Sequence, residues 1–376
     1  MDFAYTEEQT AILDLAEKIL ADGSTKERLL ELERGTAPRF DRALWKKLAE
    51  AGLLAVAVPE AHDGAGLGFL EVAGIVQRVG RTAAAVPVLE TTVLGALPLA
   101  RFGSAALQAR WLPRVARGEV VLTAALTEPE GDPRRPSTRA APEGDGFRLS
   151  GTKLCVPAAQ IADAMLVPAA TGEGRVGVFL VDAAAPGLRV TPLATTAGWP
   201  EARVDLEDVR AAAADALGDP ERGAAALEWT LLRTEAALAC FALGACESAL
   251  RLTAEYAKTR KQFDQPLAMF QAVGHRAADA YIDLEAVRLT ALQAAWRLSA
   301  ELPAAKQVAV AKHFAAAAGQ RIVHAAQHLH GGIGVDREYP LHRHFLAVKQ
   351  LELTLGGSLP QLVRLGDLLA DEPDAA

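Results

Sequence analysis

Two stretches in the second half of the chain carry side chains suited to holding a ligand. Residues 256–271 read YAKTRKQFDQPLAMFQ, and residues 328–340 read HLHGGIGVDREYP. The first contains Arg260, and a guanidinium can bond two phosphate oxygens at once because its donors form a planar fork. The second contains Gly331 and Gly332, which let the backbone approach a ligand closely. Taken singly, Arg260 could instead form a surface pair with a glutamate, and the two glycines could cap a helix.

The order and spacing of these residues resemble those of flavin-dependent acyl-CoA dehydrogenases. That family has Tyr, three residues, Arg, one residue, Gln-Phe-Gly, one residue, Pro, and then Phe-Gln, followed later by Gln-x-x-Gly-Gly-x-Gly. FAYTEEQ near the start, LTEP, LEDV and the C-terminal motifs fall in family order, so the resemblance covers nearly the whole chain. It implies a set of contacts to the adenine dinucleotide of FAD, namely Arg260, Phe263, Gln271, His328, Gly331 and Gly332.

One of these contacts departs from the family pattern. The family's glutamine, three residues before the glycine pair, is His328 here, with Gln327 beside it. A neutral imidazole can donate or accept a hydrogen bond, so the contact can survive the change.

The positions that the resemblance assigns to catalysis differ more strongly. The family reaction removes an α-proton from an acyl-CoA thioester and needs a carboxylate as general base. Counting from Tyr339–Pro340 places Leu355 at the usual position of that base. A minority of the family places the base on a helix, and that position is Thr234 here. Neither side chain can accept a proton at neutral pH, so we predict no catalytic residue in this chain.

Glu235 follows Thr234 directly, but we do not expect it to act as the base. One residue along a helix is a rotation of about 100°, so its side chain should leave the helix in a different direction. A base supplied by Glu235 after a shift of the helix stays open as an alternative.

The residues expected around the flavin ring and CoA are also altered. The family's Trp–aliphatic–Thr/Ser strand is Cys155, Val156 and Pro157 here, and proline has no N–H to donate. After LTEP the chain continues as EGDPRRP and lacks the serine expected to meet CoA. Arg134 and Arg135 in this loop could bind a phosphate or simply lie in solvent.

Composition along the chain predicts a mainly α fold with a β middle domain. Short β-prone runs at regular spacing fill residues 120–222 and favour an antiparallel barrel or sandwich. We therefore predict an N-terminal helical domain (1–119), a β-barrel domain (120–222) and a C-terminal four-helix bundle (223–376). The bundle should begin with a long helix over residues 224–258, and its second helix should bury Ala280, Leu284 and Val287 on one face.

The bulk properties exclude several other classes. A net charge of −8 argues against a nucleic-acid partner, and three cysteines without a CxxC pair suit a reducing cytoplasm. The start, MDFAYTEEQT, is not a signal peptide, and prolines and Glu90 interrupt the apolar stretch 82–100, so we propose no membrane span. Although histidines cluster near the end, His342 and His344 should face different directions, so we predict no metal site.

These observations lead to a hypothesis about assembly. The chain keeps the dinucleotide motifs and lacks the base, which a homologous acyl-CoA dehydrogenase subunit could supply in an α2β2 assembly that shares FAD. The amino-acid sequences of residues 328–343 and 349–358 are similar to those of actinobacterial α2β2 acyl-CoA dehydrogenases that act on steroid side chains. The resemblance implies a steroid acyl-CoA substrate and an electron-transfer flavoprotein as electron acceptor. The alternatives are a self-sufficient homotetrameric dehydrogenase with a displaced base, or a flavin-free CoA-binding scaffold.

Overall fold

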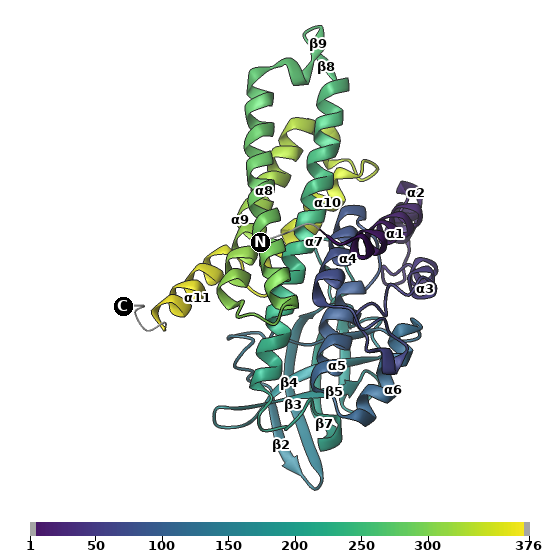
Figure 1. The fold of residues 1–376 in the computed structure, drawn as a ribbon, viewed down its shortest axis with the longest axis vertical. Coiled ribbons are helices and arrows are strands. Elements are labelled where there is room, and N and C mark those ends of the chain that lie inside the picture. Colours follow the sequence, from purple (N-terminus) through teal and green to yellow (C-terminus); the bar gives the residue numbers. More distant parts are fainter. Residues whose placement is uncertain (1–4, 372–376) are drawn as a thin grey trace. The chain divides into compact units, whose positions relative to one another are not determined.

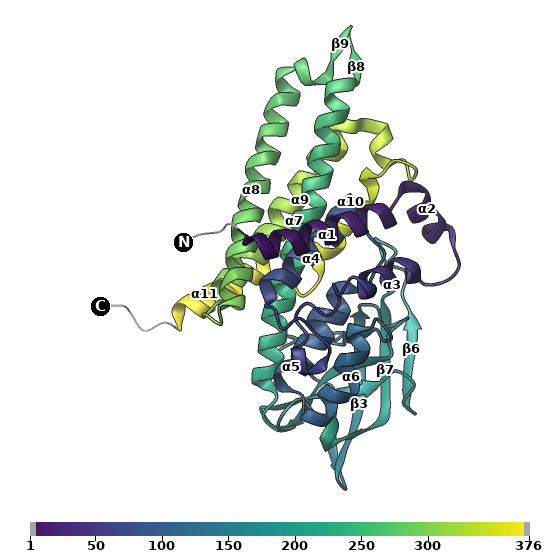
Figure 2. The same ribbon diagram turned by 45° about the vertical axis from the view of Figure 1, so that its right-hand side comes forward.

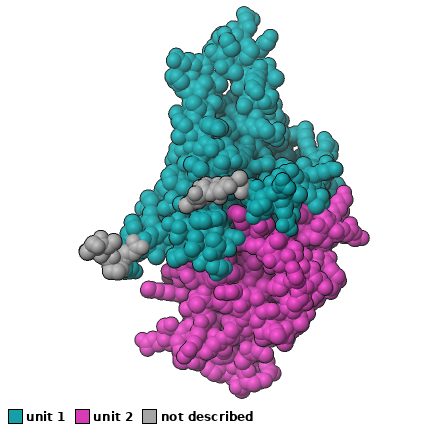
Figure 3. Space-filling view, viewed as in Figure 1, with its two compact units in different colours: residues 1–31, 73–84, 235–376 teal, residues 32–72, 85–234 magenta. Residues whose placement is uncertain are grey.

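The computed structural model describes residues 5–371, which form two compact units (Figure 3). Unit 1 comprises residues 1–31, 73–84 and 235–376, and unit 2 comprises residues 32–72 and 85–234. The units combine segments that are distant in sequence, so they do not test the predicted division into three domains. Each unit is described by itself.

Helices occupy the first third of the chain, as predicted. They are α1 (Glu7–Gly23), α2 (Lys26–Arg34), α3 (Arg42–Glu50), α4 (Phe69–Thr82), a π-helix (Leu89–Ala96), α5 (Leu97–Phe102) and α6 (Ala105–Ala116), with a 3-10 turn at Glu60–His62. Side chains define where they begin. Thr6 and Gln9 form a capping box at the start of α1, and Asp41 accepts hydrogen bonds from the first turn of α3. Such caps satisfy backbone N–H groups that have no partner within the helix.

The middle of the chain forms the seven-stranded sheet of unit 2. Its strands are β1 (Leu122–Ala124), β2 (Arg139–Glu143), β3 (Gly146–Val156), β4 (Ala164–Gly172), β5 (Arg175–Asp182), β6 (Leu188–Pro192) and β7 (Ala202–Ala212). The order is β1-β4-β2-β3-β7-β6, with β5 paired to β4, and β3, β7 and β6 can be followed in Figure 2. A β middle region is therefore confirmed. The sheet is mixed, however, because β4 pairs in parallel with both β1 and β2.

A buried ion pair fixes the loop after β1 to this sheet. The Lys153 ammonium on β3 is fully buried and donates to Glu128 Oε1 at 2.7 Å and to the Pro168 carbonyl at 2.8 Å. Glu128 also accepts hydrogen bonds from the backbone and hydroxyl groups of Ser137 and Thr138. Burial alone would raise the pKa of Glu128, but the charge and hydrogen bond of Lys153, with the two hydroxyls, hold it at about 2.

The helical C-terminal part follows the prediction closely. It contains α7 (Ala224–Thr259), α8 (Gln271–Ser299), α9 (Ala305–His330), α10 (Leu341–Leu353) and α11 (Ser358–Ala370). A short hairpin of β8 (Lys261–Gln262) and β9 (Gln265–Pro266) joins α7 to α8, whose neighbouring ends it caps in Figures 1 and 2. Ala280, Leu284 and Val287 are buried on α8 as expected. Within the described residues α10 adds a fifth helix to the four that were predicted.

One helix in the described part of the chain, α7, is long and apolar enough to span a membrane by length and composition. Its most apolar window is 78% buried inside the protein. The core helix of a globular protein has the same property, so the finding is weak evidence for a membrane segment.

We expect the substitution Lys153→Met to destabilise unit 2. It would leave the buried Glu128 carboxylate without its counter-charge, which typically costs about 3–5 kcal/mol. Because the pKa of Glu128 is depressed, the stability that the wild-type pair contributes is present above the ordinary glutamate pKa and is lost as pH falls toward about 2. Thermal unfolding of the wild type and of Lys153→Met should be measured between pH 7 and pH 3. The difference between their melting temperatures should become smaller as the pH falls. A difference that does not change with pH would contradict this account.

Candidate functional site

The hairpin between α7 and α8 carries the first set of predicted ligand residues, in unit 1. Arg260 directly follows α7 and is exposed, and its side chain has no hydrogen bond or ion pair to any residue described in the structure. The surface Arg–Glu pair that could have explained Arg260 is therefore not present there. Its guanidinium is available to an anion.

Two aromatic side chains accompany Arg260 on this hairpin. Phe263 and Asp264 form its turn, both with positive φ (52° and 64°), and the Phe263 side chain is 87% exposed. The Phe263 ring lies edge-on to Phe270 at 6.3 Å between centroids. Gln271, the first residue of α8, is also exposed. An exposed aromatic ring beside an unpaired guanidinium provides an apolar surface next to a positive charge.

The end of α9 supplies the glycine pair. Gly331 terminates the helix at φ 63° and ψ −141°, a conformation that strains any residue with a Cβ. Gly332 has no such φ, and no atom of the chain lies within 4 Å of where its Cβ would be. The cap therefore explains glycine at 331. At 332 nothing inside the chain requires glycine, and that side of the backbone is open to a ligand.

The histidine that replaces the family's glutamine is exposed at the end of α9, while Gln327 is half-buried. The Gln327 amide lies so close to Gly334 that a Cβ there would be 2.7 Å from its Nε2. Gln327 thus packs against the turn, and His328 is the exposed side chain of the two.

A stacked pair of rings that the sequence did not predict joins the two motifs. Tyr256, the first residue of the 256–271 motif, stacks on His330 with 4.5 Å between centroids and 20° between planes. His330 is held by the Ala326 carbonyl at 2.8 Å and the Tyr339 hydroxyl at 3.0 Å. Burial lowers the pKa of His330, which favours the neutral ring. The ends of α7 and α9 therefore meet within this chain.

The loop between α10 and α11 contains the position expected for a catalytic base. Leu355 occupies it with φ 55°, and the neighbouring Gly356 has φ 91°. The buried Lys312 ammonium on α9 donates to the Leu351, Glu352 and Gly356 carbonyls at 2.9–3.3 Å. Burial lowers the pKa of Lys312 to about 8. The loop is thus held by its backbone and presents an aliphatic side chain at this position.

The alternative base position lies on α7. Thr234 is buried, and its hydroxyl donates to the Thr230 carbonyl at 2.8 Å. Glu235 is completely buried, and its carboxylate accepts from Arg364 Nη1 at 2.6 Å. A carboxylate enclosed in this way is committed to an ion pair in unit 1, which argues against the displaced base.

The residues expected near a flavin ring lie in unit 2. Cys155 has φ 48° and is exposed, and the Pro157 carbonyl accepts a hydrogen bond from Thr123 at 2.6 Å. Neither Cys155 nor Pro157 offers the hydroxyl or indole that the family places here. In the neighbouring loop Arg134 bonds to Glu228 at 2.7 Å, so it is engaged in an ion pair and not simply solvated.

No group of three or more histidine, cysteine, aspartate or glutamate side chains converges on a metal-sized site anywhere in residues 5–371. His342 contacts the Tyr339 carbonyl at 2.7 Å, and His344 is buried.

Comparison with known proteins identifies the class. Three family models match in succession: the N-terminal domain of acyl-CoA dehydrogenase at residues 6–119, its middle domain at 123–209 and its C-terminal domain at 221–362. The chain belongs to the acyl-CoA dehydrogenase family. It is 43% identical over 381 residues to acyl-CoA dehydrogenase FadE27 of Mycobacterium tuberculosis, with 99% of this chain and 100% of FadE27 covered.

Solved structures agree with this assignment. A chain of the ChsE4–ChsE5 complex from Mycobacterium tuberculosis is 44% identical with a TM-score of 0.94, covering 99% of this chain and 100% of that one. A chain of the Tcur3481–Tcur3483 steroid ACAD is 45% identical with a TM-score of 0.91, covering 97% and 98%. PigA, solved as an FAD complex, is 25% identical with a TM-score of 0.90, covering 98% and 99%.

The residues present fit FAD only in part. In unit 1 the unpaired Arg260, the exposed Phe263 ring and the open side of Gly332 suit a pyrophosphate and an adenosine. In unit 2 Cys155 and Pro157 supply neither the ring packing nor the donor that an isoalloxazine needs at its edge.

The two glycines should respond differently to substitution by alanine. Gly331→Ala places a Cβ on a strained conformation and should cost about 1–3 kcal/mol of stability. Gly332→Ala meets no atom of the chain, so unfolding should be unchanged while flavin bound by the purified assembly decreases. Chemical denaturation and the flavin absorbance of each variant measure the two effects. Equal flavin content in Gly332→Ala and wild type would show that this backbone does not face the cofactor.

Glu235→Gln should impair folding and spare catalysis. Loss of one partner of the buried pair should cost about 3–5 kcal/mol, and Arg364→Met, which keeps Glu235, should cost a similar amount. Acyl-CoA-driven dye reduction, measured per folded enzyme, should change little in either variant. If Glu235 were the base, Glu235→Gln alone would lower turnover by roughly 100-fold or more.

Proposed function

We propose that this chain is a non-catalytic-type subunit of a heteromeric, flavin-dependent acyl-CoA dehydrogenase. In this proposal it contributes the dinucleotide contacts of FAD, while a homologous partner subunit supplies the catalytic base and the flavin-ring pocket. One observation carries the proposal: an accessible set of dinucleotide residues around Arg260 and Gly331 coexists with Leu355 where a proton acceptor would have to stand.

The chemistry requires the missing group to come from elsewhere. Desaturation of a thioester removes a proton from the α-carbon, and the bound flavin supplies the acceptor for the hydride from the β-carbon. A carboxylate near the α-carbon contributes roughly 10²–10⁴-fold to such a proton transfer. Leu355 has no lone pair, the Thr234 hydroxyl is engaged with the backbone, and Glu235 is paired with Arg364. The proposal therefore assigns proton removal to the partner.

The surface of unit 1 supports association with another subunit. Apolar side chains are widely exposed on α8 and on α11, where a monomeric helix would normally present polar groups. They are Ile282 (67%) and Leu289 (63%) on α8, and Leu359 (70%), Leu362 (45%), Val363 (57%) and Leu369 (54%) on α11. Covering such faces with a homologous chain would remove apolar area from water and stabilise the assembly.

The similar solved structures suggest the form of this assembly and its substrate. One is a complex of two differently named chains, and another is called a steroid ACAD. We therefore propose an α2β2 assembly in the cytoplasm that acts on the CoA thioester of a steroid side chain. An electron-transfer flavoprotein would reoxidise the flavin, and the three domains would be residues 1–119, 120–222 and 223–376.

We expect Arg260→Ala to remove flavin from the co-purified assembly. Loss of a charge-assisted contact to phosphate costs about 1.5–3 kcal/mol, so flavin affinity should fall roughly tenfold or more. Lys258→Ala is the matched control, because Lys258 is a nearby cation that pairs with Glu255. The measurement is the flavin absorbance of equal amounts of each purified assembly. Equal flavin in Arg260→Ala and Lys258→Ala would contradict the assignment.

The subunit role is tested by producing the chain alone and together with a homologous subunit encoded beside it. Visible spectra and acyl-CoA-driven dye reduction distinguish the possibilities. The proposal requires activity only in the mixed preparation. A yellow, active lone chain would support a self-sufficient dehydrogenase, and preparations that are colourless in both cases would support a flavin-free scaffold.

A further inference from the structure

A cavity in unit 1 has no role in the proposed flavin site. It has a volume of about 850 Å³, is open to solvent, and is lined by α1, α2, α4, α7, α8 and α10. Five basic side chains line it (Lys26, Arg81, Arg251, Arg288 and Arg343) against two acidic ones (Glu17 and Glu247). The lining of this cavity therefore carries more positive than negative charge, although the net charge of the whole chain is −8.

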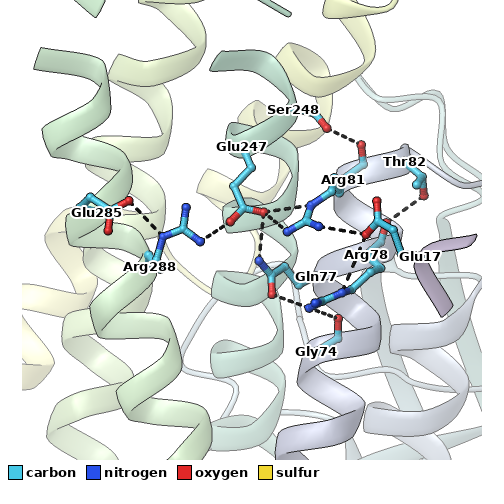
Figure 4. A network of polar contacts seen from close by, with 10 residues as sticks. All are labelled: Glu17, Gly74, Gln77, Arg78, Arg81, Thr82, Glu247, Ser248, Glu285 and Arg288. Atoms are coloured by element: carbon cyan, nitrogen blue, oxygen red, sulfur yellow. Dashed lines mark hydrogen bonds and ion pairs between the residues drawn. The ribbon is translucent and has the colours of Figure 1, made fainter. Parts of the chain in front are cut away.

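One wall of the cavity is a closed ion-pair network (Figure 4). Glu247 on α7 accepts from Arg81 on α4 and from Arg288 on α8, both at 2.5 Å. Arg81 also pairs with Glu17 at 3.0 Å, and Arg288 with Glu285 at 3.1 Å. These carboxylates balance the charges of the guanidinium groups in the wall.

Two of the other basic side chains are not balanced in this way. Lys26 on α2 and Arg251 on α7 are exposed, and within the described chain neither has an acidic partner. No acidic residue of the cavity lining is left for them, because Glu17 and Glu247 belong to the wall. The positive charge without an acidic partner in the cavity therefore lies on Lys26 and Arg251.

Polar groups without partners occur in the same lining. Ser24 Oγ and His344 Nδ1 are buried and have no hydrogen-bond partner among the described residues. His344 is 95% buried, since its exposed fraction is 5%. Burial, together with the charges of Arg343 and Arg251, lowers the pKa of His344 to about 4. Buried polar atoms are normally satisfied, so these two indicate a missing hydrogen-bond partner in the cavity.

The cavity also has an apolar surface. Leu250 and Leu284 line it, and the ring of Tyr281 is 57% exposed there. Phosphate alone would fill only a small part of a cavity of this volume. An exposed aromatic ring beside unpaired cations suits a ligand that has both an anionic group and a flat or apolar body.

We propose that this cavity binds a phosphorylated small molecule, with its phosphate near Arg251 and Lys26 and its body against Tyr281. This site is separate from the dinucleotide residues. Arg251 lies on α7, and Arg260 lies nine positions later, directly after the helix ends, about 13 Å away along the helix axis at 1.5 Å per residue. The inference does not depend on the chain binding flavin.

Titration calorimetry with ADP and inorganic pyrophosphate tests the site on the full chain at low salt. The background is Arg260→Ala, which disables the proposed flavin contact so that ADP bound there is not counted. We expect ADP and pyrophosphate to bind and adenosine not to bind. Adding Arg251→Ala should weaken both anions tenfold or more, while adding Lys258→Ala, the matched control, should leave them unchanged. Tyr281→Ala should weaken ADP and spare pyrophosphate.

Two outcomes of the calorimetry would overturn the proposal. One is that no anion binds in the Arg260→Ala background. The other is that anions bind but Arg251→Ala does not weaken them. An unchanged ADP affinity in Tyr281→Ala would exclude the stacking role of the ring. Binding by the lone chain that is lost in the assembly with its partner would show that a subunit, and not a small molecule, fills the cavity. None of these results bears on whether Arg260 holds flavin.

Discussion

Removal of a proton from carbon requires an atom with a lone pair at the right place, and this constraint governs how the chain can be used. Hydrogen bonds hold the backbone of the loop that should present such an atom. Lys312 donates to the Gly356 carbonyl in the loop and to the Leu351 and Glu352 carbonyls at the end of α10, and Leu355 lies in the loop at φ 55°. The loop geometry is thus specified by buried backbone contacts that do not depend on the side chain at 355. A carboxylate can be lost from such a loop without loss of the fold.

The dinucleotide contacts can be kept while the ring contacts and the catalytic base are lost, because the two sets of residues rely on different kinds of interaction. The proposed dinucleotide contacts rely on a cation without a partner among the described residues and on an open backbone, which are located where α7 and α9 end. The stacking of Tyr256 on His330 ties these ends together inside one chain, so these residues are held by contacts that do not involve the β middle region. Ring binding and proton transfer need specific side chains at single positions, and substitution at Cys155, Pro157 and Leu355 is enough to remove them. Retention of one half and loss of the other is therefore physically consistent.

Sequence reasoning predicted the features that local patterns encode. The long helix from Ala224, the end of α9 at Gly331 and the β middle region follow from periodicity, glycine placement and composition. It missed interactions between residues distant in sequence, such as Lys153 with the Pro168 carbonyl and Glu235 with Arg364. It also missed the parallel pairings of β4, because which strands pair depends on contacts between distant segments and not on the local sequence pattern. A lysine or glutamate in the sequence gives no sign that it is buried, so these residues could not be assigned in advance.

The proposed assembly rests on the same separation. If this chain associated only with copies of itself, each dinucleotide half would face another Leu355, and no copy would provide a proton acceptor. A complete site needs one chain that keeps the base and one that completes the cofactor pocket, so the proposed assembly has half as many complete sites as subunits. Selection would then act on this chain through the accessible Arg260 and through the apolar faces of α8 and α11. Those features lie at the surface of unit 1, whereas Leu355 is half-buried and Thr234 is buried.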